Sequence, residues 1–149
     1  MYNDWLKGTW KLDTFKATDE NGQVIDVMGP GATGFICYSQ DGFVSVQIIK
    51  ADRVRYDIPD IAGGTVEQTL SAARGLFAYA GKYNVDEEQA IVYHNLEFAI
   101  VPNWIGSVQK RYITKESEDV LVLSADPARI GPGGIKRTAR LRWVRMGTS

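Results

Sequence analysis

The chain has 149 residues, of which 44% are hydrophobic and 23% are charged. This size and composition predict one globular domain over residues 1–149, with enough apolar material for a core. The 17 Lys and Arg residues balance 18 Asp and Glu residues, which argues against a nucleic-acid partner because nucleic-acid-binding domains usually carry a basic excess. One cysteine and one histidine exclude an internal disulfide framework and argue against a structural zinc site, so we expect no metal and no cofactor.

Apolar runs in the chain stay well short of the roughly 18 residues that a transmembrane helix needs, so we expect no membrane partner. Residues 1–8 lack the basic start and apolar stretch of a secretory signal, and we therefore expect a cytoplasmic protein. The chain has 15 Gly together with 4 Trp, 7 Tyr and 5 Phe. Many turns and many large rings indicate short strands around an apolar interior.

Alternating apolar and polar residues between turn signals predict two groups of strands, one on each side of a single helix. The first group has strands over residues 9–18, 34–39 and 43–50. Thr65 and Gln68 have the spacing of a capping box, and apolar residues at helical spacing follow them, so we expect a helix over 66–78. The second group has strands over residues 80–86, 89–100, 106–115, 120–125 and 136–146.

These eight short strands predict an all-β fold, an antiparallel up-and-down meander with the helix between its third and fourth strands. Closing the meander into an eight-stranded barrel removes its exposed edges. A barrel of this size holds either packed side chains or one small ligand, so the fold class alone does not select between these contents.

The first and last predicted strands carry residues that meet if the barrel closes. Trp10 lies on the first strand, and Trp143 and Arg145 share one face of the last strand. We therefore expect Trp10 and Trp143 to close one end of the barrel, with Arg145 stacked across the ring of Trp10. The other basic residues of the last strand are expected on a solvated face; they are Lys136, Arg137, Arg140 and Arg142.

Motifs that run along nearly the whole chain give a more specific signal. They are Gly8-Thr9-Trp10-Lys11-Leu12, Gly29-Pro30, Gly34, Tyr38, Asp41-Gly42, Ala78-Tyr79-Ala80-Gly81-Lys82-Tyr83, His94, Pro102-Asn103-Trp104-Ile105-Gly106, Gln109, Arg111 and Leu141-Arg142-Trp143-Val144-Arg145. In this order they resemble the lipocalin-like domain proteins of bacteria and fungi, and the resemblance implies a small, calycin-type, lipocalin-like barrel. The chain departs from the family pattern at Asn95, where relatives tend to have a second histidine, and at Ala99, where they tend to have serine.

Residues 89–100 and 106–115 are expected to form a hairpin whose alternating side chains fall into two sets. One set is polar and contains Asn95, Glu97, Gln109 and Arg111; the other is more apolar and contains His94, Leu96 and Tyr112. If the apolar set forms the core, the polar set is solvated and holds an ordinary cross-strand Glu–Arg pair. If the polar set faces inward, it lines a cavity and must pair with itself, with water or with a ligand. The resemblance favours the second arrangement.

Three residues of this hairpin are the candidate catalytic groups. Arg111 offers a fork of donors suited to a carboxylate or an enolate-like oxygen. Glu97 stays ionised if it pairs with Arg111, and becomes a general acid or base if it is desolvated without that partner. His94 is either a satisfied core or rim residue or a proton shuttle near neutral pH.

Polar and aromatic side chains supply the candidate ligand contacts, which are Tyr38, Phe77, Tyr79, Tyr83, Asn95, Trp104, Gln109 and Tyr112. Phe77 and Tyr79, at the end of the predicted helix, either cover the open end of the barrel or pack the helix against it. Trp104 either packs the barrel end or shields the cavity mouth.

Three functions remain open from the sequence. The first is a module that binds a small, partly apolar molecule, which the aromatic residues enclose and the polar set orients. The second is a cofactor-free cyclase or isomerase that acts on a polyketide- or terpenoid-like intermediate, because some fungal relatives in natural-product pathways look like such enzymes. The third is a structural protein with a filled barrel. A homodimer is also left open.

Overall fold

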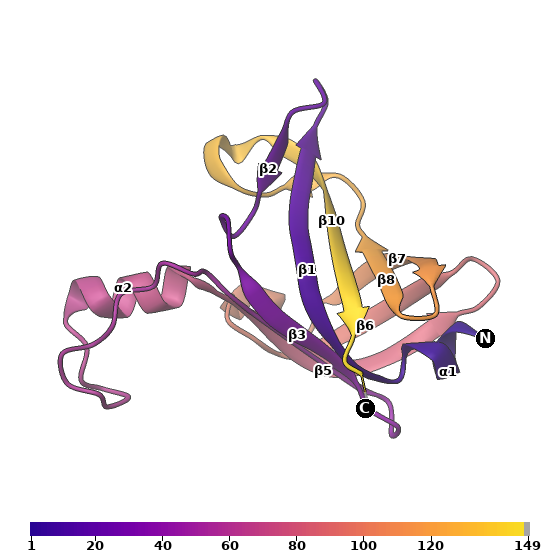
Figure 1. Cartoon of the computed structure of the whole chain (residues 1–149), viewed down its shortest axis with the longest axis horizontal. Helices are drawn as coiled ribbons and strands as arrows, with labels where there is room; N and C mark the ends of the chain where they lie inside the picture. Colours follow the sequence, from indigo (N-terminus) through magenta and orange to yellow (C-terminus); the bar gives the residue numbers. More distant parts are fainter. Residues whose placement is uncertain (148–149) are drawn as a thin grey trace.

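The computed structural model describes residues 1–147 of the chain, and its regular secondary structure is mostly strands (Figure 1). In chain order the elements are α1 (Tyr2–Leu6), β1 (Gly8–Asp19), β2 (Val24–Asp26), β3 (Thr33–Tyr38), β4 (Phe43–Ile49), α2 (Val66–Arg74), β5 (Leu76–Asp86), β6 (Ile91–Ala99), η1 (Pro102–Trp104), β7 (Val108–Ser117), β8 (Val120–Ser124), β9 (Ala128–Arg129), η2 (Pro132–Gly134) and β10 (Lys136–Arg145). None of the described helices is long and apolar enough to cross a membrane.

Eight of the strands form a closed antiparallel barrel, which confirms the predicted fold. The order around the barrel is β1, β3, β4, β5, β6, β7, β8 and β10. β10 pairs with β1 along most of their lengths, from Trp10 opposite Arg145 to Asp19 opposite Arg137, and so closes the sheet (Figure 1). The short strands β2 and β9 extend β1 and β10 at one end.

Side chains alternate between the barrel interior and solvent along each strand, as the period of two requires. On β4, for example, Val44, Val46 and Ile48 are buried while the residues between them are more exposed. The buried residues form one continuous hydrophobic cluster that reaches from β1 to β10. The largest fully buried side chains in this cluster include Trp10, Trp143 and Tyr38.

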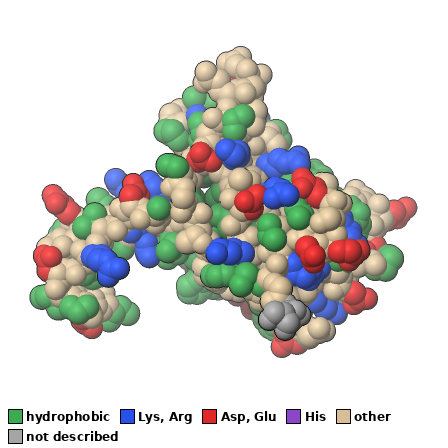
Figure 2. Space-filling model, viewed as in Figure 1, with side chains coloured by type: hydrophobic (Ala, Val, Ile, Leu, Met, Phe, Trp, Pro, Cys, Tyr) green, Lys and Arg blue, Asp and Glu red, His purple; other side chains and the backbone are tan. Residues whose placement is uncertain are grey.

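The helix α2 is shorter than the predicted helix over 66–78. Its capping box is present, since the Thr65 side chain accepts a hydrogen bond from the backbone N–H of Gln68 and the Gln68 side chain accepts one from Thr65. The helix ends at Arg74, because the next residues pair with β4, with Phe77 opposite Ile48. Phe77 and Tyr79 are therefore barrel-strand residues. α2 buries none of its own side chains and belongs to an arm that projects from the barrel (Figures 1 and 2).

One end of the barrel is covered by the N-terminal segment. The guanidinium of Arg145 lies over the ring of Trp10, 4.1 Å from its centroid, and donates a hydrogen bond of 2.8 Å to the carbonyl of Trp5. The indole N–H of Trp10 donates to the carbonyl of Leu6 at 2.9 Å. The stack therefore ties both chain ends to the closed end of the barrel.

Candidate functional site

The barrel encloses a cavity of about 450 Å³. Its apolar wall comes from inward residues of six strands, among them Phe15, Ile36, Val46, Phe77, Leu123, Ala139 and Leu141. Polar side chains interrupt this wall; they are Tyr79, Gln109, Lys110, Arg111, Asp126, Arg129, Arg137 and Trp143. The loop over residues 125–130 also contributes to the lining. This is the combination of apolar surface and a few placed polar groups that small-molecule sites show.

A chain of three buried side chains lies beside the cavity. The hydroxyl of Tyr38 from β3 is 2.8 Å from Nε2 of His94, and the hydroxyl of Tyr79 from β5 is 2.7 Å from its Nδ1. His94 itself is 0% exposed and lies on β6. Of the three, Tyr79 is the one that lines the cavity. Both ring nitrogens are thus occupied, so the imidazole is fixed in its orientation.

Burial sets the protonation of this chain. Desolvation, with a smaller contribution from the Arg111 charge, lowers the pKa of His94 to about 3. Desolvation also raises the pKa of Tyr38 and of Tyr79, although the Arg111 charge opposes part of the rise. At neutral pH His94 is therefore neutral and both hydroxyls are protonated. Of the two interpretations of His94, its burial and its two hydroxyl partners favour a satisfied core residue over a proton shuttle near neutral pH.

Arg111 lies on β7 and lines the cavity. Its guanidinium donates to the carbonyl of Lys110 at 2.9 Å and, more weakly, to Oε1 of Gln109 at 3.5 Å. Within residues 1–147, no carboxylate forms an ion pair with it. The cavity wall therefore carries a cationic fork of donors that is only partly used by the protein.

Two buried donors in the cavity wall have no hydrogen-bond partner among the described residues. One is the indole N–H of Trp143, a residue that is 1% exposed. The other is Nε of Arg137. A different nitrogen of the same guanidinium, Nη1, donates to the carbonyls of Ile130 and Pro132 at 2.7 and 3.0 Å. Unsatisfied buried donors are rare and costly, so a small movement of the wall that brought an acceptor in the cavity to them would stabilise them.

The hairpin of β6 and β7 brings together a different polar set from the one expected. His94 pairs with Gln109 and Val92 pairs with Arg111, so the inward residues of the two strands have opposite parity. Asn95 consequently faces outward, where its side chain donates to Asn84, and Glu97 is exposed. Neither lines the cavity, and Glu97 forms no pair with Arg111. Their expected place inside the barrel is wrong because the connection through η1 offsets the register by one residue.

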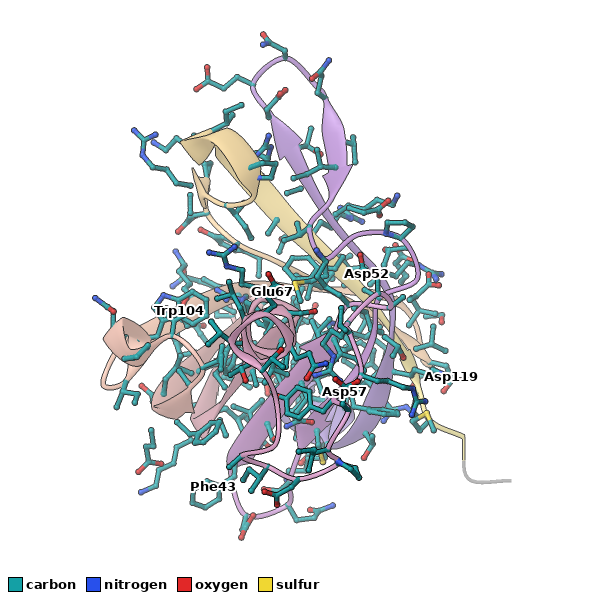
Figure 3. All side chains as sticks on the ribbon, turned by 90° about the vertical axis from the view of Figure 1, so that its left-hand side faces the viewer. Phe43, Asp52, Asp57, Glu67, Trp104 and Asp119 are labelled. Carbon is teal, nitrogen blue, oxygen red and sulfur yellow. The ribbon has the colours of Figure 1, made fainter. Side chains whose placement is uncertain are left out.

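The aromatic candidates divide between the cavity and other places. Phe77 and Trp104 line the cavity together, with ring centroids 5.6 Å apart in an edge-on arrangement. Trp104 comes from η1 and lies on the barrel side of that turn (Figure 3). Tyr83 does not line the cavity, because its hydroxyl donates to the Ser39 carbonyl. Tyr112 faces outward and donates to the Asp126 carboxylate at 2.6 Å.

Sequence reasoning missed Trp143 and Arg137 as cavity residues. The sequence pattern predicts Trp143 at the barrel end and Arg137 on a solvated face, yet Arg137 is 6% exposed and both residues line the cavity. The signal was present, since the period of two places both on the same face of β10 as the buried Leu141. The loop over residues 125–130 had no comparable signal. Among the described residues, no group of three or more His, Cys, Asp and Glu side chains is placed to hold a metal ion.

Comparison with known proteins identifies a family and a curated relative. The model of a family described as "Lipocalin-like domain" matches residues 7–146. A protein of Aspergillus oryzae, named 4'-hydroxy-3'-methoxypropiophenone carrier protein ppsC, is 25% identical over 109 residues. The match covers 69% of this chain and 96% of the relative.

Several solved β-barrels are also similar to the chain. A redesigned β-barrel is 14% identical with a TM-score of 0.44, over 97% of this chain and 95% of that one. A de novo designed fluorescence-activating β-barrel is 9% identical, also with a TM-score of 0.44, over 97% and 96% of the two chains.

Proposed function

The chain belongs to the lipocalin-like domain family, and we propose that it is a carrier that holds a small, partly apolar molecule in its barrel. The cavity carries this proposal: its volume of about 450 Å³ suits a molecule of drug-like size, for which pockets of roughly 300–1,000 Å³ are usual. A filled barrel, the structural alternative, would leave no such space.

The relative's name supports a specific ligand class. A propiophenone is an aromatic ring with a short ketone side chain, and the Aspergillus relative is named as a carrier of one. Here Phe77 and Trp104 offer ring faces and edges to an aromatic ligand. Tyr79 and Arg111 offer donors to a carbonyl. We therefore propose that the molecule carried by this chain is also a small aryl ketone.

The protonation of the interior favours carriage over catalysis. A general acid or base works best with a pKa near the operating pH, whereas the pKa of His94 is about 3 and that of Tyr79 is raised. Glu97, the other candidate for proton transfer, lies outside the barrel. A cyclase or isomerase would then have to rely on enforced conformation and hydrogen bonding alone.

A binding experiment tests the proposal. Because Trp104 and Trp143 line the cavity, 4'-hydroxy-3'-methoxypropiophenone should change the tryptophan emission saturably, with one molecule bound per chain. Ala139→Phe places a ring inside the cavity and should weaken binding by about tenfold or more, since it removes ligand volume. Ala80→Phe, on the outward face opposite Ser45, is the matched control and should bind like wild type.

Equal binding by both variants would place the ligand outside the barrel and contradict the proposal. Chromatography and NMR of the ligand recovered after incubation separate a carrier from an enzyme, because a rearranged product can have the same mass as its substrate. A carrier returns it unchanged, whereas a cyclase or isomerase accumulates a rearranged product from its substrate.

A further inference from the structure

The polar part of the cavity wall consists mainly of donors. We define the donor wall as the hydroxyl of Tyr79, the guanidinium of Arg111 and the indole N–H of Trp143, all of which belong to cavity-lining residues. Each of the two side-chain acceptors nearby already accepts one hydrogen bond. Oε1 of Gln109 accepts from Arg111, and the Asp126 carboxylate accepts from Tyr112. An occupant therefore meets more donors than acceptors.

The hydrogen bonds of His94 decide where the Tyr79 proton goes. A neutral imidazole donates through one nitrogen and accepts through the other. If Nε2 carried the proton, it would donate to Tyr38, and the Tyr38 proton would have no acceptor among the described residues, although that side chain is 1% exposed. If Nδ1 carries the proton, Tyr38 donates to Nε2, and the hydroxyl proton left without a protein acceptor is that of Tyr79, which is 3% exposed but lines the cavity.

The second arrangement leaves the Tyr79 hydroxyl free to donate its hydrogen bond elsewhere. Nδ1–H of His94 then donates to the Tyr79 oxygen, and the Tyr79 hydroxyl must find its own acceptor. Tyr79 lines the cavity, so an acceptor there can meet it. The unpartnered indole N–H of Trp143 has the same requirement.

We infer that the cavity selects a molecule with a hydrogen-bond acceptor oxygen, of a ketone or of a carboxylate, and that this oxygen binds to the donor wall. This inference rests on the proposed function, since it names the group by which the carried molecule is recognised. The structure assigns the Nδ1–H tautomer of His94 as the device that turns the Tyr79 hydroxyl toward that oxygen.

Three probes of nearly equal size test the inference by calorimetry: propiophenone, propylbenzene and 3-phenylpropanoate. A cavity that makes no hydrogen bond to the oxygen should bind propylbenzene most tightly, because the other two probes lose hydration on entry. Recognition by the donor wall instead makes propiophenone or 3-phenylpropanoate bind about fivefold or more tighter than propylbenzene. The tighter of these two distinguishes a ketone from a carboxylate site.

The outcomes separate the inference from the proposed function. Equal binding of the three probes, or a preference for propylbenzene, overturns the inference and leaves a carrier of apolar molecules. Failure of all three to bind overturns the proposed function for ligands of this size, and the inference with it.

Variants locate the recognition. Trp143→Phe and Tyr79→Phe keep a ring in place and should each reduce the preference for the oxygen-bearing probe by about threefold or more, without weakening propylbenzene binding. Trp10→Phe and Tyr93→Phe are the matched controls, because neither residue lines the cavity, and should keep the preference. Unchanged preference in both cavity variants overturns the inference.

Two further measurements test the inference without a ligand. Without ligand, Trp143→Phe should lower the melting temperature less than Trp10→Phe, because both lose the same buried ring volume but only Trp10→Phe also breaks a hydrogen bond, the one to Leu6. The chain has one histidine, so ¹⁵N NMR reports its tautomer directly. A protonated Nδ1 supports the inference, and a protonated Nε2 overturns the role given to Tyr79.

Discussion

His94 shows how strongly the environment of one residue can change its chemistry. On the exposed side of a hairpin the same imidazole would titrate close to pH 6.5. Here it is fully buried between two tyrosine hydroxyls and near the charge of Arg111, and its pKa falls to about 3. His94 therefore acts as a neutral connector between Tyr38 and Tyr79.

This depressed pKa predicts a dependence of stability on pH. Between about pH 6.5 and pH 3 the unfolded chain binds a proton at His94 that the folded chain does not, so the free energy of unfolding falls as the pH is lowered through this range. The contribution is fully present above pH 6.5. Each unit of pKa difference corresponds to about 1.4 kcal/mol.

Urea unfolding at pH 7.5, 6.5 and 5.5 measures this effect. His94→Gln is the reference variant, because glutamine can still hydrogen-bond but does not titrate. The difference in stability between wild type and variant should shrink toward pH 5.5. An imidazole NMR signal that titrates near pH 6.5 in the folded protein would contradict the prediction.

A second prediction at this scale concerns the contribution of Arg145 to stability. Replacing it with lysine removes the planar stack on Trp10 and the hydrogen bond to the Trp5 carbonyl. Arg145→Lys should lower the free energy of unfolding by about 1–2 kcal/mol in urea titrations. Arg140→Lys, at a side chain that is 60% exposed, should change it by less than about 0.5 kcal/mol, and equal losses would show that the stack is not the cause.

At the scale of elements, the contact between β5 and β6 is where the barrel is most sensitive to a side chain. The register shifts between Ala80 and Gly81, and a Cβ atom on Gly81 would overlap the carbonyl oxygen of Asn95. Only glycine allows the two strands to approach in this way. The bulge also allows Tyr79 and Ala99 to face each other across the strands while Glu97 stays outside.

Gly81→Ala should therefore destabilise the barrel by about 3 kcal/mol or more, since the clash is with backbone and cannot be relieved by a rotamer change. Thermal unfolding followed by circular dichroism measures the loss. Gly147→Ala is the control, because its Cβ would meet nothing within 4 Å, and it should melt like wild type. A stable Gly81→Ala protein would show that the β5–β6 bulge can relax.

At the scale of the whole molecule, the barrel and the arm over residues 51–74 have separate roles. The arm carries exposed apolar residues such as Ile58, Ile61 and Val66, and none of its residues lines the cavity. The two strands that it joins are already paired at its base, where the N–H of Lys50 donates to the Gly75 carbonyl at 2.9 Å. The barrel should not depend on the arm.

Replacing residues 51–74 by Asn-Gly, the turn that suits a two-residue hairpin, should leave the melting temperature within a few degrees of wild type and ligand affinity unchanged. Shortening the loop over residues 125–135 is the contrasting change, because residues 125–130 form part of the cavity wall. That variant should keep the barrel but lose affinity. Loss of folding in the arm variant would show that the arm supports the barrel.

The amino-acid sequence by itself determined the class of fold, the boundaries of the eight barrel strands to within a few residues and the stacking partners Trp10 and Arg145, but not the short strands β2 and β9. Hydrophobic alternation and turn residues are local signals, and a closed barrel follows from them because it removes sheet edges. The order of the motifs along the chain also identified the family.

Only the tertiary structure decided which residues share the cavity. The register of β6 on β7 depends on the connection through η1, and a shift of one residue exchanges the inside and outside of a strand. That shift moved Glu97 and Asn95 outside and kept His94 and Arg111 inside. The burial that makes His94 neutral, and the unpartnered donor of Trp143, exist only once strands far apart in the chain have closed around the same space.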